Sequence, residues 1–191
     1  MKIRYIWVLV LGLLVSGACQ SKKTLVSDVL EKVGQELPLL GHRNWIVVTD
    51  MAYPLQTNPG VVTYYTDWSY PEVIRWVQQK IDAMPHVYTH VFRDEEYRFL
   101  EDGICPGIDG LKKEVGEVLP EERITFCPHD ELLNRMDSVS QQYRVIVIKT
   151  PLLKPYTSVF WELDCKYWDQ EKQRLLKMNL NELSRTQKGM K

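Results

Sequence analysis

The 191-residue sequence lacks the short motifs that define several common enzyme classes. It has no Gly-x-Ser-x-Gly elbow, which argues against an α/β-hydrolase nucleophile. It has neither a phosphate-binding P-loop nor a Gly-x-Gly-x-x-Gly turn, so nucleotide and dinucleotide cofactors are disfavoured. Cys-x-x-Cys and His-Glu-x-x-His motifs are also missing. Because a zinc site needs three or four ligands at suitable spacing, this argues against a zinc site. We therefore expect no cofactor and no bound metal.

The sequence contains few cysteines and no large excess of positive or negative charge. Lys and Arg number 24 and Asp and Glu number 25, a formal net charge of −1, so nothing in the composition attracts nucleic acid. Four scattered cysteines are too few for a disulfide framework. The sequence contains no internal repeat, and 45% of its residues are hydrophobic. This composition indicates one ordinary globular domain without a nucleic-acid partner.

The N-terminal residues have the pattern of an export signal. Lys2 and Arg4 precede an unbroken apolar run, Tyr5–Val15. This run is too short to cross a bilayer as a helix, which takes about 20 residues, but it has the length of a signal-peptide apolar region. Small residues at 16–18 and then Cys19 follow, as in a bacterial lipobox, where the cysteine thiol is acylated. An ordinary secretory signal that ends near a cysteine is the alternative.

These features divide the chain into four parts. We expect a lipoprotein signal peptide at 1–18, a lipidated tether at 19–23, a folded domain at 24–168 and a C-terminal helical tail at 169–191. The lipid would anchor the protein in the bacterial cell envelope, facing the periplasm. Gln20, rather than Asp, after the cysteine favours the outer membrane over the inner membrane.

Strand and helix patterns alternate through the folded domain. The pattern predicts strands at 45–49, 61–65, 86–92, 124–126, 145–148 and 157–163, and helices at 24–36, 70–81, 111–119, 129–136 and 169–184. The segment 101–110 reads as a loop. This alternation predicts an α/β fold, a three-layer α/β/α sandwich with a largely parallel or mixed sheet. Ligands of such sheets bind at the carboxyl ends of strands, which directs attention to Asp50, His129 and the residues after Ile148.

His42 and Asp50 are the sharpest candidate pair, and they bracket one predicted strand. At about 3.3 Å per residue, eight residues of strand could separate them by roughly 25 Å. They can share a site only if the His42 turn folds back or a neighbouring subunit supplies one of them. Alone, a His in a Gly-His turn is structural or incidental, and an Asp at a strand end commonly caps a loop.

The other histidines are less specific. His129 follows Cys127-Pro128 at a predicted helix start, where it is either part of a site or a solvent-exposed residue beside the helix cap. His86 and His90 lie four apart on a predicted strand and face the same side, so we interpret them as sheet-surface residues.

Three separated motifs in the 24–168 domain resemble the RbsD/FucU family of ribose pyranases and fucose mutarotases. Leu40–Asp50 resembles the family's opening signature, a Gly-His turn followed by an apolar strand and an Asp. Pro128–Glu131 resembles its His-Glu-Glu/Asp segment at a helix start. Val145–Thr150 and Pro155–Ser158 resemble its closing strand, which ends in Arg-Thr, and the Pro-Tyr-Ala-Asn after it. The motifs occur in the family's order.

The resemblance implies an RbsD-like fold, a ring-shaped homo-oligomer and a monosaccharide substrate whose ring is opened without a cofactor. It implies that His42 is the general acid/base and that Asp50, His129, Tyr156 and Ser158 bind the sugar. Opening a cyclic hemiacetal requires one group to protonate the ring oxygen and another to take the anomeric hydroxyl proton. A histidine, with a pKa of about 6.5, can serve both steps near neutral pH.

Two positions depart from the family pattern. Ser158 stands where the family has Asn, which removes an amide donor, and Lys149 replaces an Arg, which exchanges a planar fork for a point charge. A sugar-binding lipoprotein without catalysis, or a structural or partner-binding lipoprotein with a vestigial pocket, are therefore the alternatives to a mutarotase or pyranase.

Overall fold

The computed structural model describes residues 29–189. The predicted signal peptide, Cys19 and the tether lie outside these residues, as do the first residues of the helix predicted at 24–36. The described part of that helix covers 29–36 and continues into a short 3-10 helix, η1 (Leu37–Leu39), which contains Pro38.

Six strands form one mixed sheet in the order β2-β5-β1-β6-β3-β4. The strands are β1 (Trp45–Thr49), β2 (Val61–Tyr65), β3 (Val87–Asp94), β4 (Ile124–Cys127), β5 (Val145–Lys149) and β6 (Val159–Cys165). Strands β2, β5 and β1 pair in parallel, as do β3 and β4, whereas β6 runs antiparallel to both β1 and β3. The carboxyl ends of the five parallel strands and the start of β6 therefore lie together. We name this the carboxyl end of the sheet, and the opposite side the amino end.

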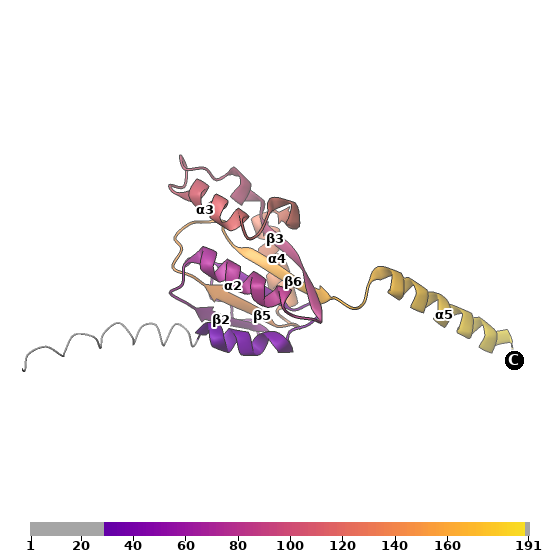
Figure 1. Ribbon diagram of the computed structural model, residues 1–191. Helices are drawn as coiled ribbons and strands as arrows, with labels where there is room; N and C mark the ends of the chain where they lie inside the picture. The colour runs from indigo at the N-terminus through magenta and orange to yellow at the C-terminus, as the bar shows by residue number, and fades with distance from the viewer. Residues whose placement is uncertain (1–28, 190–191) are drawn as a thin grey trace, which may run out of the picture.

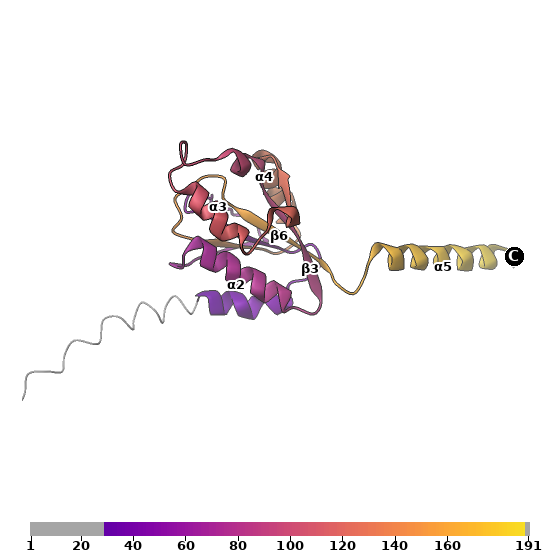
Figure 2. The same ribbon diagram turned by 45° about the horizontal axis from the view of Figure 1, so that its top comes forward.

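Helices cover both faces of the sheet and make a three-layer α/β/α sandwich (Figures 1 and 2), which confirms the predicted fold class. The helix at 29–36, α2 (Tyr70–Asp82) and α3 (Ile108–Gly116) cover one face, here named the α2 face. Helix α4 (His129–Val139) covers the other, the α4 face.

Strand β1 shows how the sequence produces these two faces. Ile46 and Val48 pack on the α2 face, Trp45 and Val47 pack on the α4 face, and all five residues of the strand are buried. Successive side chains of a strand alternate between faces. A central strand that is covered on both sides therefore needs an unbroken apolar run, which is the pattern that predicted it.

The prediction of a loop through residue 110 was wrong, because α3 already begins at Ile108. The backbone N–H of Asp109 donates to the Asp102 carboxylate at 2.9 Å, and Ile108 is fully buried, so the chain enters the helix early. The short 3-10 helix η2 (Glu95–Phe99), directly after β3, was not predicted at all.

The C-terminal helix α5 (Gln170–Gly189) extends away from the sandwich in both views (Figures 1 and 2). It confirms the helical character predicted for 169–184 and continues beyond that range. Within residues 29–189, no helix combines the length and the apolar character needed to cross a membrane.

Candidate functional site

Polar side chains gather at the carboxyl end of the sheet. Asp50 follows β1, Asp94 ends β3, His129 begins α4, and Tyr156 and Ser158 precede β6. We call these five residues the carboxyl-end cluster. Because they come from four different strand ends, the sheet topology brings together residues that are far apart in the sequence.

Asp50 and Ser158 lie at the ends of two neighbouring strands. Asp50 is 8% exposed, and its Oδ1 accepts a hydrogen bond of 2.7 Å from the Ala52 N–H. The Ser158 hydroxyl is buried and shares a 2.8 Å hydrogen bond with the hydroxyl of Thr49, the last residue of β1. Ser158 therefore fastens β6 to β1, and its hydroxyl is already engaged.

Lys149, which stands where the resemblance implies an Arg, is also engaged. Its Nζ, at the end of β5, donates a 2.5 Å hydrogen bond to the Tyr53 carbonyl in the loop after β1. This contact anchors the loop that begins at Asp50. Lys149 thus holds the loop after β1 in place and acts on the cluster only through that loop.

His129 and Asp94 form a hydrogen-bonded pair. Nδ1 of His129 lies 3.0 Å from Oδ1 of Asp94, and the His129 backbone N–H donates to the Glu96 carboxylate at 3.1 Å. Asp94 is fully buried, and its Oδ2 has no partner among the described residues. Burial raises the pKa of Asp94, and the hydrogen bond and charge of His129 offset this only in part. Asp94 therefore keeps its proton to a higher pH than an exposed aspartate does.

Tyr156 presents an aromatic ring beside this pair. Its ring centroid lies 5.2 Å from that of His129, edge to face at 89°, and the residue is 38% exposed. Its φ of 56° lies in the left-handed region, which costs a non-glycine residue of the order of 1 kcal/mol or more. Such a conformation persists where the surrounding structure fixes the backbone, and here it places an exposed aromatic ring next to a histidine and a carboxylate.

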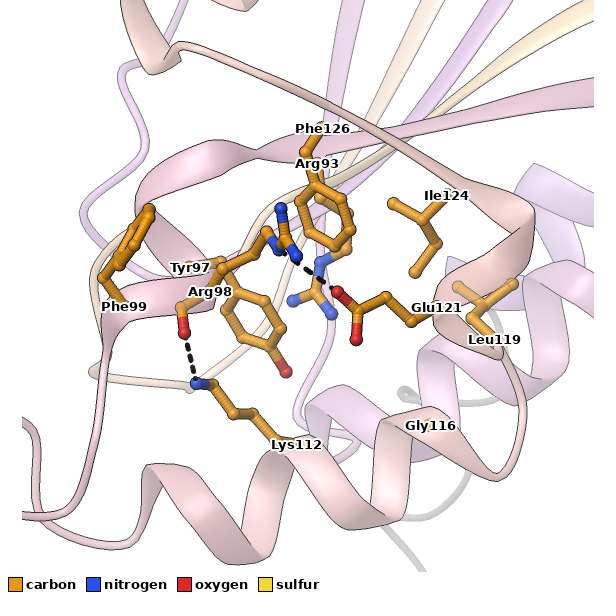
Figure 3. Close-up of a pocket in the computed structure, with 10 residues that line it drawn as sticks. All are labelled: Arg93, Tyr97, Arg98, Phe99, Lys112, Gly116, Leu119, Glu121, Ile124 and Phe126. Carbon is orange, nitrogen blue, oxygen red and sulfur yellow. Dashed lines mark hydrogen bonds and ion pairs between the residues drawn. The ribbon is translucent and has the colours of Figure 1, made fainter.

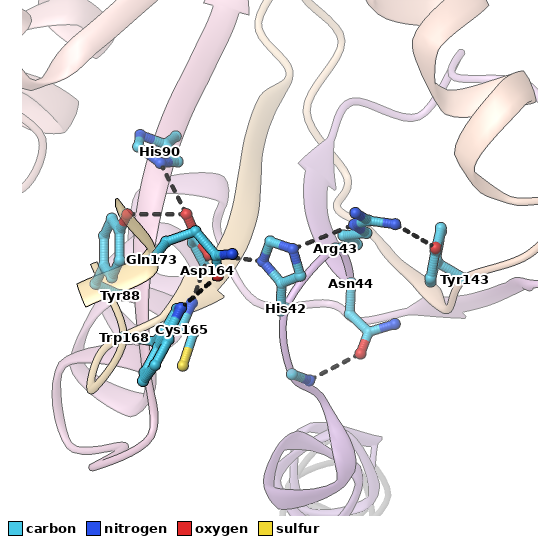
Figure 4. A network of polar contacts seen from close by, with 11 residues as sticks. His42, Arg43, Asn44, Tyr88, His90, Tyr143, Asp164, Cys165, Trp168 and Gln173 are labelled. Carbon is cyan, nitrogen blue, oxygen red and sulfur yellow. Dashed lines mark hydrogen bonds and ion pairs between the residues drawn. The ribbon is translucent and has the colours of Figure 1, made fainter. Parts of the chain in front are cut away.

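A second group of polar residues lies at the amino end of the sheet (Figure 4). Its members are His42, Arg43, Tyr88, His90 and Asp164, which we call the amino-end network. Nδ1 of His42 lies 2.6 Å from Oδ1 of Asp164, and Tyr88 donates to the other Asp164 oxygen at 2.8 Å. His90 lies 3.6 Å from the same carboxylate. Both histidine side chains are about half exposed, at 53% and 50%.

The contacts of His42 define its neutral form. Asp164 accepts from Nδ1, and Arg43 Nε donates to Nε2 at 3.2 Å, which assigns the proton to Nδ1 and the lone pair to Nε2. Partial burial of Asp164 would raise its pKa, but hydrogen bonds from the Cys165 N–H, Tyr88 and His42 together lower it. Asp164 therefore stays ionised and orients the imidazole, an arrangement suited to a general base.

The five residues assigned from sequence do not meet within one chain. Asp50, His129, Tyr156 and Ser158 belong to the carboxyl-end cluster, whereas His42 lies at the other end of β1. The His42 turn does not fold back, because His42 is hydrogen-bonded to Asp164 near the end of β6. A site with all five residues requires the amino end of a second copy.

Sequence analysis missed Asp94 and Asp164. The strand predicted at 86–92 ended two residues before Asp94, so the rule that ligands bind at strand ends did not reach it. Asp164 lies 122 residues from His42 and meets it only because β6 runs antiparallel to β1. The acidic run after residue 93 was an available signal for the first, and no local signal existed for the second.

No group of three or more His, Cys, Asp or Glu residues in the described part of the chain is arranged to hold a metal ion.

Comparisons with known proteins agree on the fold. No protein-family model matches the chain, and no curated protein is similar to it in sequence. Among solved structures, RbsD of Bacillus subtilis complexed with D-ribose superposes with a TM-score of 0.50 at 14% identity, over 70% of this chain and 91% of that chain. The fucose mutarotase of Streptococcus pneumoniae with L-fucose has a TM-score of 0.46 at 17% identity, over 73% and 93% of the two chains. FucU of Bifidobacterium longum has a TM-score of 0.45 at 11% identity, over 70% and 94%. The superposition on Bacillus subtilis RbsD shows that the chain has an RbsD-like fold.

Proposed function

We propose that this protein binds a monosaccharide and catalyses the exchange of its ring forms or anomers, as a divergent relative of the RbsD/FucU proteins. The observation that carries the proposal is the carboxyl-end cluster, which unites four of the five residues that the sequence resemblance assigns to the sugar site. The solved structure of the same fold, Bacillus subtilis RbsD, is a complex with D-ribose.

The chemistry of the cluster suits a sugar. The exposed ring of Tyr156 offers an apolar platform for the carbon face of a pyranose, and its hydroxyl provides a polar handle. Asp50 and the His129–Asp94 pair supply acceptors and donors for sugar hydroxyls. Ring opening breaks the bond between the anomeric carbon and the ring oxygen, while one group protonates the ring oxygen and another takes the anomeric hydroxyl proton. It therefore requires proton donors and acceptors and no redox partner.

His42 of a second copy completes the proposed site. Its orienting partner Asp164 stays within its own chain. Nε2 carries the lone pair that takes the anomeric proton, and the hydrogen bond that Arg43 Nε donates to it has to open first. When the amino end of one copy meets the carboxyl end of the next, the contact is heterologous and repeats, which produces a closed ring if the rotation closes. We therefore propose a homo-oligomer with a site at each junction.

Exchange NMR on the full-length protein with ribose, fucose and galactose tests the catalytic proposal. We expect the protein to accelerate exchange of at least one sugar, and His42→Ala to reduce that rate by about 10²–10⁴-fold, the usual contribution of a general acid/base. His86→Ala is the matched control, since the His86 side chain bonds the Leu40 carbonyl and belongs to neither cluster. An unchanged rate in His42→Ala would overturn the assignment.

Sugar binding without catalysis is the second candidate. It is favoured by Ser158, which has no side-chain amide to donate to a sugar. Its hydroxyl is buried and already bonded to Thr49. Calorimetry that detects sugar affinity in a protein without exchange activity would identify this function.

We also propose that the 24–168 domain is carried on a lipid anchor at Cys19 in the cell envelope, facing the periplasm. The lipobox-like sequence supports this, and Cys19 lies outside the described residues. Metabolic labelling with a fatty-acid analogue should mark the wild type and leave Cys19→Ala unlabelled. Equal labelling of both would contradict the anchor.

A further inference from the structure

A pocket of about 480 Å³ lies on the α2 face of the sheet, apart from the carboxyl-end cluster (Figure 3). Its walls come from β3, η2, α3 and β4, and we call it the α3 pocket. Asp94 of the cluster and Arg93 of the pocket are consecutive in β3, so their side chains point to opposite faces. The pocket is therefore separated from His129 by the sheet itself.

The interior of the α3 pocket holds two polar groups with unmet hydrogen bonds. Arg93 is 2% exposed; its Nη2 donates to the Thr157 carbonyl at 3.0 Å and lies 3.4 Å from the Tyr70 hydroxyl. Its Nε is buried and has no partner among the described residues, and the same is true of the hydroxyl of Tyr97, a residue 6% exposed. Leaving such groups unpaired costs about 1–3 kcal/mol each. Both atoms lie just beneath the pocket surface, so a ligand that shifts the side chains covering them gains two hydrogen bonds.

The charge of the pocket indicates the sign of that ligand. Three cations line it, Arg93, Arg98 and Lys112, against the single carboxylate of Glu121, which lies 3.1 Å from Arg98. Among residues 29–189, no carboxylate lies within ion-pair distance of the Arg93 guanidinium. The guanidinium carbon lies 3.4 Å from the centroid of the Tyr97 ring. A concave surface with an excess of positive charge attracts and holds anions.

The remaining walls are apolar, and they limit what kind of anion fits. Phe99, Phe126 and Ile124 contribute to them, and the guanidinium of Arg98 lies 5.0 Å from the Phe126 ring centroid. The volume is in the range of small-molecule sites, which is about 300–1,000 Å³. A small inorganic ion would leave these walls uncovered. A small organic molecule with a ring and one oxyanion group would cover them.

We propose that the α3 pocket binds a small organic oxyanion, a carboxylate or a phosphomonoester, as a second ligand site. The oxyanion accepts hydrogen bonds from Arg93 and from the Tyr97 hydroxyl, while its organic part lies against the aromatic walls. This site is independent of the proposed sugar chemistry, because the two share no residue.

Calorimetry on the full-length protein tests the proposal with two matched pairs of probes. Benzoate is compared with benzamide, and phenyl phosphate with phenol, so that each pair differs mainly in the charged group and no probe is a sugar. We expect at least one anion to bind in preference to its neutral counterpart, and its affinity to fall as salt is raised. The member that binds identifies the oxyanion as carboxylate or phosphate.

Two variants place the binding in the pocket. Tyr97→Phe removes only the unpartnered hydroxyl and so should leave the fold intact while it weakens anion binding by about tenfold, the effect of one hydrogen bond to a charged group. Tyr65→Phe is the same change on β2, the edge strand on the opposite side of the sheet from β4, and should have no effect. Lys112→Met, which removes one of the three cations, should also weaken binding. If neither anion binds, if the neutral counterparts bind equally well, or if Tyr97→Phe binds as tightly as wild type, the proposal is overturned.

Discussion

At the scale of single residues, two carboxylates have opposite roles at the two ends of the sheet. Asp94 is buried and paired with His129, and burial raises its pKa. Asp164 is partly exposed and accepts several hydrogen bonds, which lower its pKa. Environment therefore makes one of them a group that can hold a proton and the other a fixed negative charge beside His42.

The raised pKa of Asp94 predicts how the stability of the protein depends on pH. Below the ordinary pKa of Asp, both the folded and the unfolded chain carry the proton, and the residue contributes no difference. As pH rises through the higher native pKa, the unfolded chain gives up its proton more readily, so Asp94 destabilises the fold. Asp94→Asn should remove this cost and gain about 1 kcal/mol over wild type at neutral pH, the scale of one buried polar group.

Chemical denaturation at several pH values between acidic and neutral measures this difference. The advantage of Asp94→Asn should grow as pH rises and vanish at low pH. Asp67→Asn, which removes an exposed carboxylate in a loop, is the control and should show no such growth. An advantage that shrinks with rising pH would mean that the charged form of Asp94 stabilises the native protein.

At the scale of secondary-structure elements, the sequence predicted the existence of the strands better than their directions. Val145–Ile148 and Trp45–Val48 are apolar runs, which in an α/β protein have few alternatives to a central strand. The run that becomes β6 looks similar, yet it is antiparallel to both neighbours. Hydrophobic periodicity records burial and carries no direction, so the antiparallel strand could not be derived.

Candidate site residues were predictable where a strand end or a family motif marked their position in the sequence. Asp50 and His129 were found because a strand end can be read from the sequence, and Ser158 and Tyr156 because the resemblance placed them. The α3 pocket was not predicted, since part of its wall, Tyr97–Phe99, comes from η2. Tyr97 of η2 is buried in one cluster with Leu100 and Ile108, a contact that hydrophobic periodicity does not indicate.

At the scale of the whole molecule, His42 and the carboxyl-end cluster lie at opposite ends of the sheet, so the proposed catalysis requires assembly. We call these the two proposed half-sites. The proposed ring predicts that two inactive variants complement each other. His42→Ala lacks the base, and Asp50→Asn lacks a sugar ligand, but a junction formed by the intact amino end of one and the intact carboxyl end of the other is complete. In an equal mixture, about a quarter of the junctions have this composition.

The measurement is the exchange rate of the mixture after the two variants have been unfolded and refolded together. Each variant refolded alone should remain inactive, whereas the mixture should recover about a quarter of the wild-type rate. A mixture no more active than its components would show that His42 and Asp50 do not act on the same sugar across a junction.

The reversed direction of β6 also constrains how this chain can change over time. Ser158 lies directly before β6, at the carboxyl end of the sheet, and Asp164 lies near the last residue of β6, at the amino end. Gain or loss of a single residue inside it would turn every later side chain to the opposite face. Loops elsewhere can lengthen or shorten independently, whereas in β6 one such event would displace the residues of one half-site relative to the other.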